Sequence, residues 1–220
     1  MINKEQEFKM IRSYMSLRRA VGWIGILLPF VLMLGLIIIF RGDGILDSIS
    51  MYYYSKKRNV LVGALCGIGF FLFFYRGYDN WKRVNWDEWI TNIGGILAVA
   101  IAFCPTTECG KLDLMGIFHF IFAAVFFTLL ALYSIFVFTR KSGKITRQKR
   151  TRNKIYIACG IIMILSMIAI GIYVMFIESE SRKYPVTFWS ETIALAAFGL
   201  SWLTKGGTIS PDKPEAEHVH

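Results

Sequence analysis

The sequence predicts an all-α protein, a polytopic membrane bundle of six transmembrane helices with its N-terminus and C-terminus in the cytoplasm. Three observations support this prediction. The chain of 220 residues is 55% hydrophobic, above the roughly 45–50% apolar content of soluble domains. Its apolar residues gather in six runs separated by short polar segments. Its Lys and Arg residues concentrate in every second polar segment, as the positive-inside rule predicts.

The six apolar runs give the expected spans, because a helix needs about 20 mostly apolar residues to cross the hydrocarbon core. The first run has a basic preamble like that of a signal peptide, but it lacks a small-x-small cleavage site and is expected to be retained. The second and third runs are short, and a re-entrant pair is the alternative for them. The expected spans are residues 20–40, 58–76, 88–104, 112–139, 154–177 and 185–204, with a cytoplasmic segment at 1–19 and a polar tail at 205–220.

The distribution of basic residues sets the orientation. Eighteen Lys and Arg residues lie before the first span, after every second span and in the tail, against seven in the alternate segments. This places both termini in the cytoplasm, with the bacterial cytoplasmic membrane as the expected location. The net charge of +10 first suggests nucleic-acid binding. Its division into short runs between apolar stretches argues against that class, so membrane lipids are the expected partners.

Small residues predict one close helix pair. Gly63-x-x-x-Gly67 in the second span and Gly94, Ala98 and Ala102 in the third repeat at four-residue spacing. Such spacing puts small side chains on one helix face and allows close backbone approach. We expect the second and third helices to pack tightly through these residues.

The four cysteines fall into two kinds. Cys66 and Cys159 lie within spans, where a thiol behaves as a small apolar residue. Cys104 and Cys109 bracket a short loop that the topology puts on the outer, oxidising side, where a disulfide persists. A disulfide between these two is one expectation, and two free thiols are the alternative.

Two ionisable residues lie at membrane depth, where a charge is costly and a functional role is the default hypothesis. His119 in the fourth span and Glu191 in the sixth lie at similar depth from the outer face, so we expect a hydrogen bond or ion pair between them. Above them lies an outer loop with three further candidates, Asp47, Ser48 and Ser50. The expected ligand-binding set of this outward-facing polar pocket is His119, Glu191, Tyr53 and Arg58.

These residues support several functional hypotheses. The leading one is a non-enzymatic protein that binds or senses a lipid or small amphiphile. The alternative is a lipid or amide hydrolase in which His119 acts as general base toward Ser48, Ser50 or a water, oriented by Asp47 or Glu191. A structural polar clamp, a small transporter and a subunit of a membrane complex are further alternatives. No cofactor is expected. No metal site is expected either, because the other two histidines lie in the tail.

Four stretches of the chain resemble an uncharacterised bacterial family of integral membrane proteins. They are Ser48–Tyr54, Gly63–Gly67 continued through Tyr75–Asp79, Arg152–Tyr156 and Phe198–Leu203. Members of that family are known only as membrane proteins of unknown function. The resemblance therefore implies six helices and offers no activity.

A looser resemblance is to the alkaline ceramidase and membrane receptor superfamily of membrane-embedded hydrolases. Ser48 or Ser50, Asp47 and His119 can be matched to the serine, aspartate and one histidine of that superfamily. The paired histidines of a late helix are absent here, and six helices are expected where the superfamily has seven. The resemblance implies a hydrolase site of serine, aspartate and histidine, without the full set of zinc ligands.

Overall fold

The computed structural model describes residues 4–35, 38, 45–75, 86–107, 113–140, 146–176 and 185–211, and every regular element in these ranges is helical. The long helices are α1 (Lys4–Leu34), α2 (Arg58–Phe73), α3 (Trp86–Phe103), α4 (Leu114–Leu132), α5 (Arg147–Phe176) and α6 (Val186–Lys205). Two short elements complete them, the 3-10 helix η2 (Ser50–Tyr54) and the π-helical turn η3 (Tyr133–Val137) that continues α4.

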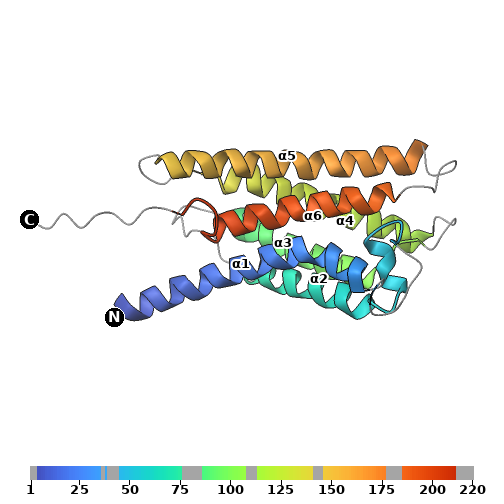
Figure 1. The fold of residues 1–220 in the computed structure, drawn as a ribbon, viewed down its shortest axis with the longest axis horizontal. Helices are drawn as coiled ribbons and strands as arrows, with labels where there is room; N and C mark the ends of the chain where they lie inside the picture. Colours follow the sequence, from blue (N-terminus) through green and yellow to red (C-terminus); the bar gives the residue numbers. More distant parts are fainter. Residues whose placement is uncertain are drawn as a thin grey trace, which may run out of the picture.

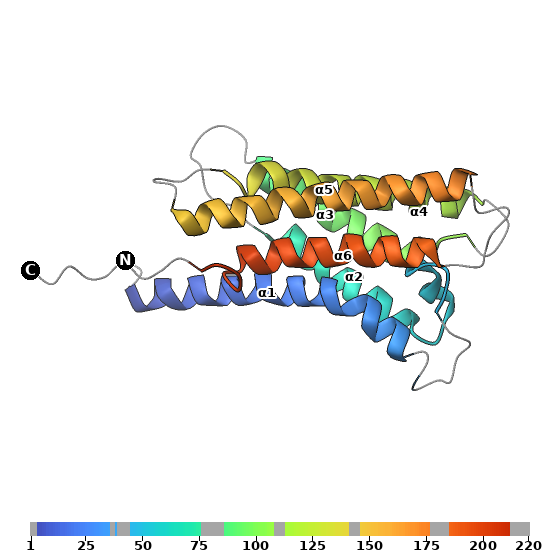
Figure 2. The same cartoon turned by 45° about the horizontal axis from the view of Figure 1, so that its top comes forward.

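The six long helices run along one axis and form a ring in chain order (Figures 1 and 2). Each helix packs against its neighbours in sequence, and α6 closes the ring against α1. The start of α1 and the end of α6 lie at the same end of the bundle, called here the proximal end (Figure 1). η2 lies at the opposite, distal end. The ring therefore brings the starts of α4 and α6 to the same end as η2.

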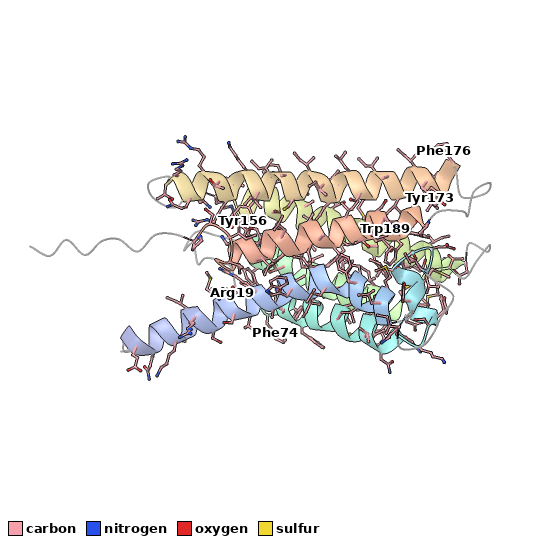
Figure 3. All side chains as sticks on the ribbon, in the orientation of Figure 1. Arg19, Phe74, Tyr156, Tyr173, Phe176 and Trp189 are labelled. Carbon is pink, nitrogen blue, oxygen red and sulfur yellow. The ribbon has the colours of Figure 1, made fainter. Side chains whose placement is uncertain are left out.

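Four of the helices are long and apolar enough to cross a membrane. These segments are Lys9–Leu34, Leu114–Val137, Arg147–Phe176 and Val186–Lys205. The other two, α2 and α3, are apolar and uninterrupted but shorter, with 16 and 18 residues. At 1.5 Å per residue α2 is about 24 Å long, somewhat less than the roughly 30 Å hydrocarbon core. Large apolar side chains such as Phe74 and Phe176 project away from the bundle (Figure 3).

The helices match the six expected spans, but α1 and α5 begin well before their apolar runs. α1 starts at Lys4, within the segment 1–19 that was expected to stand apart, and α5 starts at Arg147 where 154 was expected. Hydropathy detects only the apolar part of a helix, whereas Lys, Arg, Gln and Glu are themselves good helix formers. Arg19 donates from Nε to the Gly206 carbonyl at 2.8 Å, so the first turns of α1 lie beyond the end of α6.

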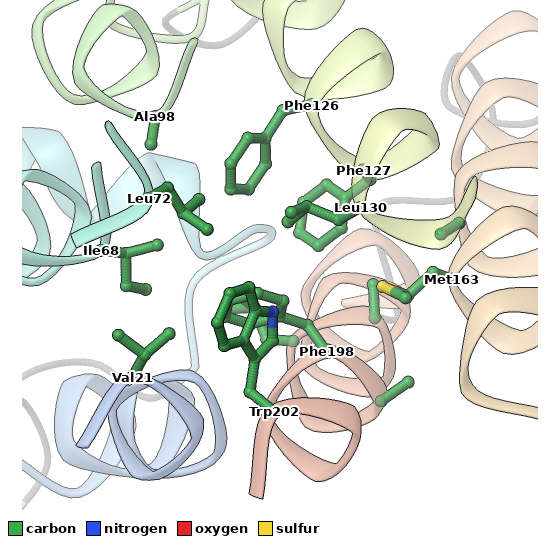
Figure 4. Close-up of a cluster of buried hydrophobic side chains, with 14 of the residues drawn as sticks. Val21, Ile68, Leu72, Ala98, Phe126, Phe127, Leu130, Met163, Phe198 and Trp202 are labelled. Carbon is green, nitrogen blue, oxygen red and sulfur yellow. The ribbon is translucent and has the colours of Figure 1, made fainter. Parts of the chain in front are cut away.

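The centre of the ring is filled by large apolar side chains from all six helices (Figure 4). Trp202 of α6 is 1% exposed. Five aromatic rings surround it at centroid distances between 5.2 and 6.4 Å, those of Phe71, Tyr75, Tyr133, Phe138 and Phe198. The π-helical turn lets Tyr133 and Phe138 both reach this cluster, because the Phe138 amide bonds back five residues to the Tyr133 carbonyl.

The close pairing of α2 with α3 is confirmed, and on α3 the expected face of Gly94, Ala98 and Ala102 is buried, but on α2 the expected glycines are the wrong ones. A Cβ on Gly63 or Gly67 meets no atom within 4 Å. The helices instead touch at Gly69 and Gly95, where a Cβ on Gly95 lies 2.6 Å from the Gly69 carbonyl oxygen. At about 100° per residue, Gly69 faces roughly opposite to Gly67 on α2. On α2 the four-residue spacing identified a small-residue face that is not the buried one.

Candidate functional site

A loop of residues 45–57 folds across the distal end of the bundle and positions the candidate site. The phenol ring of Tyr52 is fully buried and packs against Phe188 of α6, and this burial raises the pKa of Tyr52 above its ordinary value. The Phe188 amide donates to the Asp47 carbonyl at 2.9 Å, which fixes the loop to the start of α6. Tyr54 donates its hydroxyl to the Thr106 carbonyl at 2.7 Å, which fixes it to the segment after α3.

One polar side chain of this loop meets two polar side chains from the helices beneath it. His119 of α4 is 4% exposed, and its Nε2 lies 2.9 Å from the Ser50 hydroxyl. The Ser50 hydroxyl in turn lies 3.2 Å from Glu191 Oε1 of α6. Glu191 Oε2 accepts a hydrogen bond from the Ile49 amide. We call His119, Ser50 and Glu191 the distal clamp, because together they join α4 and α6 through the loop.

The orientation of His119 is set by the end of α3. Its Nδ1 lies 2.6 Å from the Cys104 carbonyl oxygen, and a carbonyl oxygen only accepts, so Nδ1 carries a hydrogen. Cys104 directly follows the last residue of α3, where carbonyl groups lack helical partners. Pro105 comes next and ends the helix. The imidazole therefore satisfies an otherwise unpaired backbone acceptor and holds Nε2 toward Ser50.

The clamp differs from a hydrolase triad in the order in which its three side chains contact one another. In that arrangement the carboxylate holds the histidine and the histidine contacts the serine. Here the backbone carbonyl of Cys104 holds His119, and the carboxyl group of Glu191 contacts Ser50 directly. Ser50 thus lies between an imidazole and a carboxyl group. His119 and Glu191, expected to bond directly, are joined through the serine hydroxyl.

The other predicted residues lie near the clamp without joining it. Asp47 contributes its backbone carbonyl, while its side chain is exposed. Ser48 accepts from the Met51 amide at 3.1 Å and caps the η2 turn. Arg58 donates to the Tyr53 hydroxyl and its guanidinium lies 4.2 Å above the Tyr53 ring. Tyr53 and Arg58 therefore form a separate pair on the exposed side of the loop.

The two loop cysteines are described only in part. Cys104 carries a free thiol, which donates to the Met115 carbonyl at 3.2 Å. Its burial raises the pKa of this thiol, with the nearby Asp113 carboxylate adding to the effect. Cys109 lies outside the described residues, and the free thiol of Cys104 corresponds to the alternative of unpaired thiols and not to the disulfide.

Three backbone groups of the site were missed by the sequence analysis. They are the Cys104 carbonyl that binds His119, the Ile49 amide that binds Glu191, and the Thr106 carbonyl that binds Tyr54. Backbone partners leave no trace in residue type. One signal was nevertheless available, because a helix that ends before Pro105 leaves carbonyl acceptors without helical donors. His119 is the first polar side chain on α4 that can serve them.

The geometry defines a class of protein before any comparison. In the residues that the structure describes, the chain is an all-helical bundle with four helices apolar enough to span a membrane and a partly buried cluster of polar side chains at one end. Within the described ranges, no group of three His, Cys, Asp or Glu side chains is placed to hold a metal ion. Comparison of the chain with protein-family models, curated proteins and solved structures finds no match.

Proposed function

We propose that this chain is a six-span protein of the bacterial cytoplasmic membrane with both termini in the cytoplasm and the distal clamp facing outward. Four helices of spanning length and composition support this, and α2 and α3 occupy equivalent places in the same ring. The shared position of the start of α1 and the end of α6 fits an even number of spans (Figure 1). The excess of Lys and Arg in the proximal segments fits a cytoplasmic proximal end.

The orientation has a direct test. Alkaline phosphatase, which is active only outside the cytoplasm, is inserted after Lys56 in the distal loop, and a fluorescent protein that matures only in the cytoplasm is fused after His220. We expect both reporters to be active. The exchanged pair, with the phosphatase at the C-terminus and the fluorescent protein in the loop, is expected to be silent. Activity of the exchanged pair would reverse the orientation.

We further propose that the distal clamp and its loop bind a lipid headgroup or a small amphiphile. The observation that carries this proposal is the meeting of His119, Ser50 and Glu191 at the outer level of the bundle. Buried polar side chains are unusual at membrane depth and favour a functional role. On the outer turns of α4 and α6 the exposed side chains are large and apolar, Met115, Phe118, Trp189 and Ile193 among them. An amphiphile could place its polar head at Ser50 and its apolar tail along these exposed faces of α4 and α6.

Ligand binding is tested by thermal unfolding of the detergent-solubilised protein with phosphatidylethanolamine, phosphatidylglycerol and lysophospholipids. We expect one class to raise the midpoint of unfolding of the wild type by several degrees, and Ser50→Ala to weaken its apparent affinity at least tenfold. Ser55→Ala is the matched control, because Ser55 makes its hydrogen bonds within the same loop and outside the clamp. If every lipid stabilised the wild type, Ser50→Ala and Ser55→Ala equally, the lipids would act only as a general solvent for the bundle. That result would contradict the proposal.

Hydrolysis is the second candidate function, and one contact favours it. The 2.9 Å separation of His119 Nε2 and the Ser50 hydroxyl is within the range for a general base and its nucleophile. The bond from Ser50 to Glu191 competes with this role, because one hydroxyl hydrogen cannot serve both acceptors. Product analysis in the same lipid experiment separates the two functions. Turnover that disappears in Ser50→Ala and His119→Ala, while both still unfold cooperatively, would replace binding by catalysis.

A further inference from the structure

We propose that the distal clamp is a proton-operated latch, which holds the outer loop closed while it contains one shared proton and releases the loop when that proton leaves. The proposal concerns the same residues as the proposed function, but it does not depend on any ligand. Its basis is the number of hydrogen atoms that the observed contacts require.

The contacts form one continuous chain with fixed ends. At one end His119 Nδ1–H must donate to the Cys104 carbonyl, 2.6 Å away. At the other end Glu191 Oε2 must accept from the Ile49 amide. Between them lie two contacts, Nε2 to the Ser50 hydroxyl at 2.9 Å and that hydroxyl to Glu191 Oε1 at 3.2 Å. A hydrogen bond needs a hydrogen between its two heavy atoms, so these two inner contacts require two hydrogens.

The Ser50 hydroxyl supplies one of these hydrogens, and the second must come from His119 or Glu191. With a neutral imidazole, Ser50 donates to Nε2 and a protonated Glu191 donates to Ser50. With an imidazolium, Nε2 donates to Ser50 and Ser50 donates to the Glu191 carboxylate. The two arrangements contain the same number of protons and differ only in where two hydrogens lie. In both, the clamp keeps every contact and has no net charge.

Removal of one proton breaks the chain. A neutral His119 beside an ionised Glu191 leaves a single hydroxyl hydrogen for two acceptors, so one inner contact places two lone pairs against each other. Moving the imidazole hydrogen from Nδ1 to Nε2 does not restore the missing hydrogen bond, because Nδ1 would then face the Cys104 carbonyl without a hydrogen. A buried polar group without a partner is costly. The open loop, in which water solvates each group, becomes the favoured state.

The sign of the pH dependence follows from this count. The closed loop contains one proton more than the open loop, in which the solvated carboxyl group is ionised and the imidazole neutral at neutral pH. By linkage, lower pH favours the closed loop and higher pH favours the open loop. A single linked proton changes the ratio of open to closed loop about tenfold per pH unit.

No other charged group within the described ranges is hydrogen-bonded to the clamp. On α4, Asp113 caps its own helix through the Gly116 amide at 2.8 Å. On the loop, the Asp47 side chain is exposed and Arg58 lies over Tyr53. Two more titratable groups face the same end, the buried Tyr52 phenol against Phe188 of α6 and Lys57 against Gly35, the residue after α1. Both lie on the loop itself, and burial raises the pKa of the Tyr52 phenol.

The clamp joins the centre of the loop, Ile49 and Ser50, to α4 and α6, so its release is a local event. On either side of it, Asp47 bonds to α6 and Tyr54 bonds to the segment after α3, and both anchors lie outside the clamp. Two of the segments it joins, α4 and α6, touch each other little directly. Loss of the clamp therefore loosens the loop around Ile49 and Ser50 without separating the main helix pairs.

The experiment is hydrogen–deuterium exchange of the full-length protein in detergent, without added ligand, between about pH 7 and 9, where a solvated imidazole is mostly neutral. The measured quantity is the exchange rate of amides 49–55, divided by the intrinsic chemical rate at each pH. For the wild type we expect this ratio to rise about tenfold per pH unit. Amides in the middle of α6 serve as the internal reference and are expected to stay constant. A flat ratio for the wild-type loop would overturn the proposal.

Glu191→Gln provides the decisive comparison. Its carboxamide donates to Ser50, accepts from the Ile49 amide and has no proton to lose, so every contact of the clamp is kept at all pH values. We expect a closed loop whose exchange ratio does not change with pH. Asp113→Asn is the matched control, since it removes a nearby carboxylate that caps α4 and leaves the clamp intact, and it is expected to behave as wild type. An unchanged pH dependence in Glu191→Gln would show that another group is responsible.

Discussion

Replacement of Trp202 by Ala is expected to lower the free energy of unfolding by about 3–5 kcal/mol, as for other large aromatic side chains removed from a core. The indole is 1% exposed and lies in the middle of the ring of helices. It contacts aromatic rings from α2, η3 and the segments that follow them, Phe71, Tyr75, Tyr133 and Phe138. Its loss leaves a cavity that these rings cannot fill together.

The measurement is an SDS titration of the purified protein in mixed micelles, followed by circular dichroism. Trp189→Ala on the same helix is the matched control, because its side chain is 44% exposed on the outside of the bundle. We expect the control to change stability by less than about 1 kcal/mol, as surface substitutions usually do. Equal losses in both variants would mean that the aromatic cluster is not the centre of the folded core.

The sequence was sufficient for the helices because their signal is local. Six apolar runs predict six helices, and the structure has them. Their ends were less predictable, since the polar residues of Lys4–Arg19 and Arg147–Lys154 continue a helix without adding hydropathy. Four of the six have the length and composition of a span, whereas α2 and α3 are shorter than a straight crossing requires.

The candidate site was predictable in part because depth along a helix can be counted. His119 and Glu191 are each the sixth residue of their helix, and both helices start at the distal end. Equal depth brought them to the same level, as expected. The sequence did not distinguish Ser50 from Ser48, because the difference depends on the η2 turn. That turn directs one hydroxyl to the clamp and the other to the Met51 amide.

Orientation around a helix axis was the feature that sequence spacing did not determine. Gly63 and Gly67 have the spacing of a helix-contact motif, yet they lie on an exposed face of α2. The buried face is set by the large residues Ile68 and Leu72, which point to the core. Gly69 lies beside them and meets α3. A small-residue motif therefore shows where close approach is allowed, and burial of the large side chains decides where it happens.

Gly95→Ala is the second substitution for which we expect a large effect, a loss of about 3 kcal/mol at the upper end of the range for overpacking. A Cβ at this position lies 2.6 Å from the Gly69 carbonyl oxygen and 2.7 Å from the Phe73 amide nitrogen. Both obstacles belong to the backbone of α2, so no side-chain rotation relieves them. The methyl group can be accommodated only if α2 and α3 move apart, which weakens one of the most extensive helix contacts in the bundle.

Gly67→Ala separates this packing effect from the general effect of adding a methyl group to an apolar helix. Its Cβ meets no atom within 4 Å, and alanine is the better helix former. We expect this variant to be as stable as the wild type or slightly more so in the same SDS titration. Each variant adds one methyl group, Gly95→Ala on α3 and Gly67→Ala on α2. If Gly67→Ala were the more damaging of the two, the buried faces of α2 and α3 would have to be rotated, and Gly63 and Gly67 would form the contact after all.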